Sequence, residues 1–200
     1  MVFRASNLKV NLLWKIVDHE TNDEYRLGIQ ELLDDGWDIL GIVADGKPGL
    51  GKLFPSIPFQ LCHFHMFATV TRYISKNPKL KASLEFRQIM FDLKQSDKDS
   101  FEYWITEWHN KWRRFLAERT IDPITQKSTF THQRLRQAFF GVRRCLDALF
   151  TFQFHSKTIQ IPNTTNSIDG YFSHLKSKLS VHRGASISTQ INLISELIFL

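Results

Sequence analysis

The sequence predicts an α/β fold whose core is interrupted by a mostly α-helical insertion. Residues 11–44 read as strand, helix and strand with short connections, an order that favours parallel pairing through a crossover. From residue 66 to about 155 the apolar residues instead recur with helical spacing. The chain therefore divides into an α/β part over residues 1–65, a helical insertion over 66–160 and C-terminal helices of the core over 161–200.

The α/β part contains three apolar runs and one amphipathic helix. The runs predict strands at residues 11–17, 37–44 and 59–65. Between the first two, Thr21 is followed three residues later by Glu24, a capping-box sequence that predicts the start of a helix. Gly36 predicts the end of that helix.

Two long amphipathic helices dominate the insertion. The first carries a stripe of aromatic residues at Phe101, Trp104, Trp108, Trp112 and Phe115. Helical spacing makes such a stripe typical of a core face, although aromatic side chains also stack on bases of single-stranded nucleic acid. Residues 132–150 predict the second helix. Residues 119–131 contain a proline and polar turn residues, and they read as the loop between the two helices.

The positive charge lies in the second half of the chain. The net charge is +6 over 200 residues; residues 1–100 hold 13 Lys/Arg and 13 Asp/Glu, whereas residues 101–200 hold 13 and 7. Basic clusters interleaved with aromatic residues suit a polyanion, and solvated helix faces are the alternative. No apolar run reaches the ~20 residues that cross a bilayer. The two cysteines form no disulfide framework, so we expect a cytoplasmic protein with no membrane partner.

Asp45 opens the loop "DGKPGLGK" (45–52) at the end of an apolar run. The glycines and the lysine partly match a phosphate-binding loop, but Leu53 stands where that loop needs a Mg²⁺-binding hydroxyl. Pro55 also limits the helix that should follow. Ligand sites gather at the carboxyl ends of strands in α/β sheets, and carboxylates suit Mg²⁺. Asp45 is therefore a candidate metal ligand, and a turn cap is the alternative.

A second candidate acid lies on a predicted helix that starts near residue 167. The core stripe of this helix is Ile168, Phe172, Leu175 and Leu179. Asp169 and Lys176 run beside that stripe and are separated by two turns, so they share a face about 10 Å apart. Arg183 joins this face if the helix persists. An ordinary exposed acid and lysine are the alternative.

Three stretches together resemble the catalytic domain of Mutator-like insertion-sequence transposases. They are "ADGKPGL", "FPSIPFQLCHFH" and "PNTTNSIDGYFSHLKSKLSVHRG". The resemblance implies a ribonuclease H-like core and an Asp–Asp–Glu triad that holds two Mg²⁺ or Mn²⁺ ions for DNA cleavage and transfer. It also implies DNA as the partner, a homo-oligomer when the protein is full length, and association with the nucleoid if the protein is bacterial.

The resemblance assigns roles to individual residues. Asp45 matches the second acid and Asp169 the third, which makes both the expected catalytic residues and metal ligands. Cys62 and His65 match a Cys-x-x-His motif near the site. Lys176 matches the basic residue seven positions after the third acid; together with Lys178, His182 and Arg183 of the basic cluster at 174–183, it makes up the expected DNA-binding residues.

Two departures from the family pattern bear on activity. The third acid is Asp169 where the family has Glu, and no residue convincingly matches the first acid, since Asp18 lies too close to Asp45. We therefore expect an incomplete ribonuclease H-like core that lacks its first strand, with weak or no activity. A catalytically dead DNA-binding or assembly module is the alternative. A zinc site at Cys62 and His65 would need ligands from a distant segment.

Overall fold

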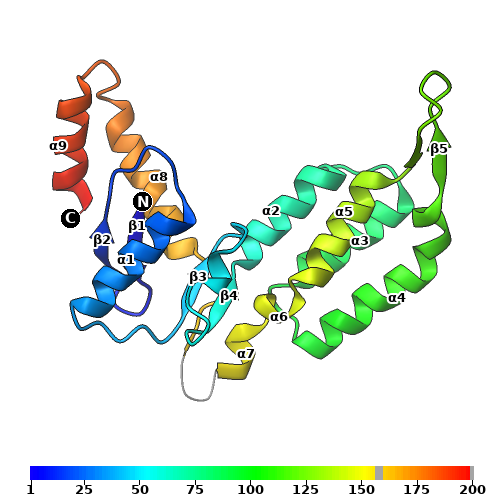
Figure 1. Cartoon of the computed structure of the whole chain (residues 1–200), viewed down its shortest axis with the longest axis horizontal. Helices are drawn as coiled ribbons and strands as arrows, with labels where there is room; N and C mark the ends of the chain where they lie inside the picture. The colour runs from blue at the N-terminus through cyan, green and yellow to red at the C-terminus, as the bar shows by residue number, and fades with distance from the viewer. Residues whose placement is uncertain (156–159, 199–200) are drawn as a thin grey trace. The chain divides into compact units, whose positions relative to one another are not determined.

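The computed structural model describes residues 1–155 and 160–198, and within them the fold is mixed α/β. The chain separates into two compact units (Figure 1). The first comprises Met1–Leu40, Lys47–Ile57 and Thr165–Leu200, and the second comprises Gly41–Gly46 and Pro58–Thr164. No helix among the described residues is both long and apolar enough to cross a membrane.

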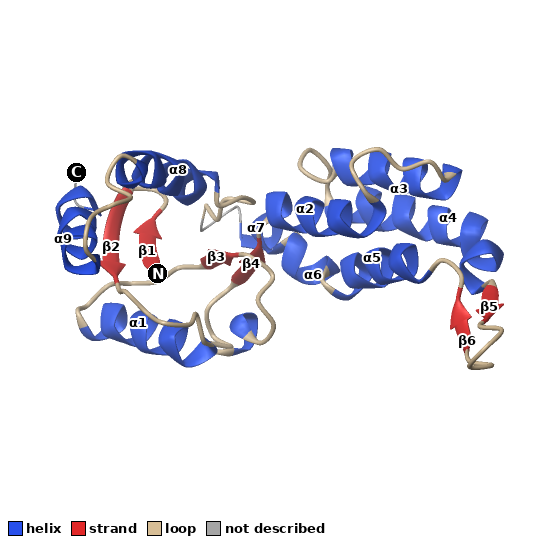
Figure 2. Cartoon of the chain, turned by 90° about the horizontal axis from the view of Figure 1, so that it is seen from above, coloured by secondary structure: helices blue, strands red, loops and turns tan. Residues whose placement is uncertain are grey.

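The first unit is built around a two-stranded antiparallel hairpin. Its elements are β1 (Val2–Ala5), β2 (Val10–Trp14), α1 (Asn22–Asp34), the 3₁₀ turn η1 (Leu50–Lys52), α8 (Asn166–Ser180) and α9 (Ile187–Ile198). Figure 2 shows α1 on one side of the hairpin and α8 on the other. Successive residues of a strand point to opposite faces, and β1 follows this rule. Phe3 packs edge-on against Tyr25 of α1, whereas the Arg4 guanidinium lies over the Tyr171 ring of α8.

Local signals set both ends of α1 as the sequence predicts. Thr21 is the N-cap, and its hydroxyl accepts a hydrogen bond of 3.2 Å from the Glu24 backbone N–H. Gly36 takes a φ of +86°, a left-handed conformation that glycine adopts without strain. The N–H of Gly36 then donates to the Leu33 carbonyl, which closes the last turn.

The second unit contains a short parallel strand pair and a set of helices. Its elements are β3 (Ile42–Ala44), β4 (Phe59–Leu61), α2 (His63–Ile74), α3 (Lys81–Asp92), α4 (Lys98–Ala117), β5 (Arg119–Ile121), β6 (Ser128–Phe130), α5 (Gln133–Arg144), α6 (Leu146–Leu149) and α7 (Thr151–His155). The β5–β6 hairpin projects from the shared end of α4 and α5 (Figures 1 and 2).

A single hydrophobic core joins α2, α3, α4, α5 and α6. Phe86, Trp108 and Phe139 form its centre, with ring centroids 4.6 and 5.3 Å from that of Trp108. The aromatic stripe of α4 therefore serves the core only in part, because Trp108 is 3% exposed but Trp104 is 38% exposed.

The strands pair differently from the predicted crossover. The first predicted strand forms β2, which pairs with β1, while β3 pairs in parallel with β4. The described strands thus form three two-stranded sheets rather than one continuous sheet, and the ribonuclease H-like core stays an expectation. The strand expected at 37–44 is confined to 42–44. The strand expected at 59–65 ends at Leu61, because α2 begins at His63.

Two predictions about the helical segment were wrong. Residues 119–131 are not a simple loop, since β5 and β6 pair there and the carboxylate of Asp122 accepts hydrogen bonds from two backbone N–H groups in the tip. The helix expected over 132–150 is interrupted at Cys145, which separates α5 from α6.

Candidate functional site

The β3–β4 pair places Asp45 and Cys62 at the carboxyl ends of neighbouring parallel strands. Ala44 is paired with Leu61 in the strand register, and the Cys62 N–H donates a 2.8 Å hydrogen bond to the Ala44 carbonyl. Asp45 follows directly and is exposed, whereas Cys62 is fully buried. A carboxylate is thus presented at the edge where α/β proteins gather their ligand sites.

The segment after Asp45 lacks the architecture of a phosphate-binding loop. Such a loop leads into a helix whose N-terminal N–H groups bind the phosphate. Here Gly49 takes a φ of +87° and leads into η1, a 3₁₀ turn of three residues. The amide of Asn22 lies 2.7 Å from where a Cβ on Gly49 would be, and it donates a 3.0 Å hydrogen bond to the Pro48 carbonyl. The segment is therefore packed against the start of α1.

The Cys-x-x-His motif forms the start of α2. Cys62 is the N-cap residue and His65 lies half-buried in the first turn, with its ring edge-on to the exposed ring of Phe64. Among the described residues no three His, Cys, Asp or Glu side chains are placed to share a metal. The structure therefore supplies no ligand set for the zinc alternative within those residues.

Two buried polar residues beside this motif were not predicted from the sequence to have a role. Gln60 is fully buried; its side-chain N–H groups donate to the Leu61 and Leu149 carbonyls at 2.7 Å, and its Oε1 accepts from the Phe152 N–H at 2.9 Å. His63 is 2% exposed and bonds the same Leu149 carbonyl. The only sequence signal for this network is a glutamine inside an apolar strand.

Asp169 lies in the first turn of α8 and is half-buried. Its Oδ2 accepts a 3.1 Å hydrogen bond from the hydroxyl of Thr165, the N-cap residue, and this bond orients the carboxylate. Lys176 and Lys178 are exposed further along the same helix. The helix ends at Ser180, so Arg183 does not continue the face shared by Asp169 and Lys176; both His182 and Arg183 are exposed beyond the helix end.

Asp45 and Asp169 belong to different compact units. Their convergence on a shared ion therefore stays a prediction. Within each unit the local placement is defined: Asp45 at a strand end, and Asp169 at a helix start.

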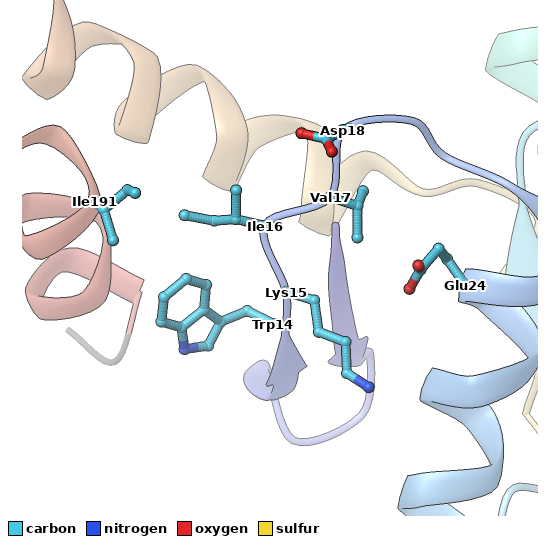
Figure 3. Close-up of a pocket in the computed structure, with 7 residues that line it drawn as sticks. All are labelled: Trp14, Lys15, Ile16, Val17, Asp18, Glu24 and Ile191. Atoms are coloured by element: carbon cyan, nitrogen blue, oxygen red, sulfur yellow. The ribbon is translucent and has the colours of Figure 1, made fainter. Parts of the chain in front are cut away.

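A cavity of about 630 Å³ opens in the first unit beside the end of β2. Its lining residues are Trp14, Lys15, Ile16, Val17, Asp18, Glu24 and Ile191 (Figure 3). Ile16 points toward Ile191 of α9, whereas Lys15 points toward α1, where it forms an ion pair with Glu31. The cavity contains none of the site residues that the sequence predicts.

Comparisons with models of known protein families, with curated proteins and with solved structures find no match to this chain.

Proposed function

We propose that this chain is the catalytic-domain part of a Mutator-like transposase, which transfers phosphoryl groups during DNA cleavage and strand transfer. The observation that carries the proposal is the exposed carboxylate of Asp45 directly after β3. Cys62 directly follows the neighbouring strand β4, and its N–H donates to the Ala44 carbonyl. This arrangement suits two of the three stretches on which the resemblance depends, those that contain Asp45 and Cys62. DNA is the proposed partner, together with further copies of the full-length protein.

The donor chemistry of the two proposed acids suits a hard divalent cation. Carboxylate oxygens are the ligands that Mg²⁺ and Mn²⁺ prefer. Asp45 and Asp169 would hold the ion, and the bond from Thr165 already orients one of the two carboxylates. Bound there, the metal would activate the attacking oxygen and stabilise the leaving one. Lys176, exposed two turns along α8, would contact the DNA backbone.

Metal binding tests the site without requiring turnover. Calorimetric titration of Mn²⁺ should detect a site that is lost in both Asp45→Asn and Asp169→Asn, because each variant removes one of the two shared carboxylates. Asp38→Asn is the matched control, since it removes an exposed aspartate seven residues before Asp45. If either site variant binds Mn²⁺ as the unaltered chain does, the shared site is wrong.

Catalysis provides the second arm of the test. Nicking of DNA with Mg²⁺ or Mn²⁺ should be weak for this chain, because Asp169 replaces the Glu of the family and the first acid has no match. A version extended upstream should nick more strongly if the extension carries that acid. If it carries the acid and stays inactive with either metal, the enzymatic proposal fails.

The second candidate function is a DNA-binding or assembly module without catalysis. It is favoured by the exposed basic residues at and beyond the end of α8, which include Lys178 and Arg183 and which need no metal to bind phosphates. DNA binding that weakens steeply with salt, but that neither Mg²⁺ nor Asp45→Asn changes, would support this module over the enzyme.

A further inference from the structure

The helices α4 and α5 pack together and carry an excess of positive charge. The α5 sequence "QRLRQAFFGVRR" contains four arginines and no acidic residue, and the second half of α4 adds Lys111, Arg113 and Arg114. Basic side chains therefore outnumber acidic ones on these two packed helices, and of those in the second half of α4 Lys111 is paired with Glu85 of α3.

His109 of α4 contacts α5 and lies within the electrostatic influence of three of these arginines. Its ring stacks on Phe139 of α5 with centroids 4.6 Å apart and an interplanar angle of 4°. Burial lowers the pKa of His109, and the charges of Arg143, Arg136 and Arg113 lower it further. Three guanidinium groups from two helices therefore act on one imidazole.

Among the described residues, the three arginines around His109 are not paired with carboxylates. The Arg136 guanidinium lies 3.8 Å from the Phe130 ring centroid, and it donates a 3.0 Å hydrogen bond to the Leu116 carbonyl. Arg113 and Arg143 are exposed. In the part of the chain that the structure describes, no carboxylate lies within ion-pair distance of any of the three. Their charge remains available to an anion.

We propose that the arginine face formed by Arg113, Arg136 and Arg143 binds the phosphate backbone of duplex DNA. The partner's identity rests on the proposed function, whereas the anion chemistry rests on the face itself. Guanidinium groups bind phosphate oxygens through paired hydrogen bonds. The nearby rings of Phe130 and Phe139 are already stacked on Arg136 and His109, so they offer no platform for unpaired bases. Contacts to the backbone position a duplex without reading its sequence.

A pair of matched double variants tests the face. Arg113→Gln/Arg143→Gln removes two charges that act on His109, while Arg114→Gln/Arg144→Gln removes two charges from the adjacent positions of the same helices. Fluorescence anisotropy with a labelled 30-base-pair DNA duplex should show at least about tenfold weaker binding for the first variant only. Its plot of log affinity against log salt should also lose roughly 2 units of slope, because about two phosphate contacts are gone.

The His109 ring supplies a readout at the face itself. DNA phosphates would offset the arginine charges, so the pKa of His109, followed by NMR, should rise when the duplex is added to the unaltered chain. The proposal is overturned if both double variants weaken DNA binding equally, if neither does, or if His109 does not respond. Tighter binding of a single-stranded or RNA probe than of the duplex would also overturn it.

These outcomes are separate from those that test the catalytic site. Mn²⁺ binding that depends on Asp45 and Asp169, with DNA binding insensitive to the arginine variants, removes only the arginine face. Arginine-dependent DNA binding without Mn²⁺ binding keeps the face and removes the catalytic proposal.

Discussion

The Nε2 of His63 donates a 2.6 Å hydrogen bond to the carbonyl oxygen of Leu149, 86 residues further along the chain. Because a carbonyl only accepts, this bond fixes the proton on Nε2 and leaves Nδ1 as a buried acceptor, for which the described residues provide no partner. Rings of Phe150 and Phe152 pack edge-on against the imidazole at 5.7 and 5.6 Å. The start of α2 is thereby tied to the region of α6 and α7.

Acidification should destabilise the protein through His63. Burial lowers the pKa of His63 from 6.5, the bond to Leu149 partly opposes this, and Lys94 adds to the lowering. As the pH falls, the unfolded chain therefore binds the proton before the folded chain does. The contribution of His63 to stability is complete above about pH 6.5 and is lost as the pH falls below that value. Urea unfolding at pH 7.5 and 5.5 measures how the free energy of unfolding changes with pH. This change should be smaller in His63→Gln than in the unaltered chain, by at most about 1.4 kcal/mol per pH unit. An unchanged dependence in this variant would contradict the assignment.

Replacing Gln60 should test the neighbouring hydrogen bonds. Gln60→Leu leaves the Phe152 N–H without its acceptor and should lower the free energy of unfolding by about 1–3 kcal/mol. Gln60→Glu should cost more, because a carboxylate oxygen would then face the Leu61 and Leu149 carbonyls. Gln137→Leu, at an exposed position of α5, is the control and should change little. Equal stability of Gln60→Leu and the unaltered chain would exclude this role.

Two tryptophans of α4 should separate core packing from surface exposure. Trp108→Ala should lower the free energy of unfolding by about 3–5 kcal/mol, because it opens a cavity and removes the 3.0 Å hydrogen bond to the Ala82 carbonyl. Trp104→Ala should cost about 1 kcal/mol or less, since this side chain is 38% exposed. Thermal unfolding compares the two, and a larger loss for Trp104→Ala would refute the described packing.

Local signals in the sequence predict the elements whose ends are set by their own residues. Thr21 and Gly36 bound α1 because a hydroxyl at the N-cap and a glycine at the C-terminus act within one turn. The start of α8 lies close to the predicted position, but within the described part of the chain Thr165 makes no side-chain capping hydrogen bond to the backbone there; its hydroxyl donates to the Asp169 carboxylate instead. The position of Asp45 directly after a strand was also predictable, because the apolar run that precedes it is a local signal.

Features that depend on distant partners were not predictable. Residues 119–121 and 128–130 show no apolar alternation, and β5 is exposed throughout, so the hairpin leaves no hydrophobic signal. The carbonyl that accepts hydrogen bonds from Gln60 and His63 belongs to Leu149, and no sequence pattern identifies Leu149 as their partner. Such pairings are fixed by tertiary packing, and the convergence of Asp45 with Asp169 is a prediction of this same long-range kind.

The last prediction concerns Gly28, which lies inside α1 where it faces β1. A Cβ at this position would lie 2.4 Å from the ring of Phe3, so Gly28→Ala should destabilise the first unit even though alanine favours helix by about 1 kcal/mol. Gly170→Ala in α8 is the matched control; nothing lies within 4 Å of its Cβ position, so it should stabilise by about 0.5–1 kcal/mol. Adding Phe3→Leu to Gly28→Ala should restore part of the loss, because the smaller side chain makes room for the methyl group. Urea unfolding of the four proteins tests this; equal stability of the two single glycine variants would show that Phe3 does not pack against α1.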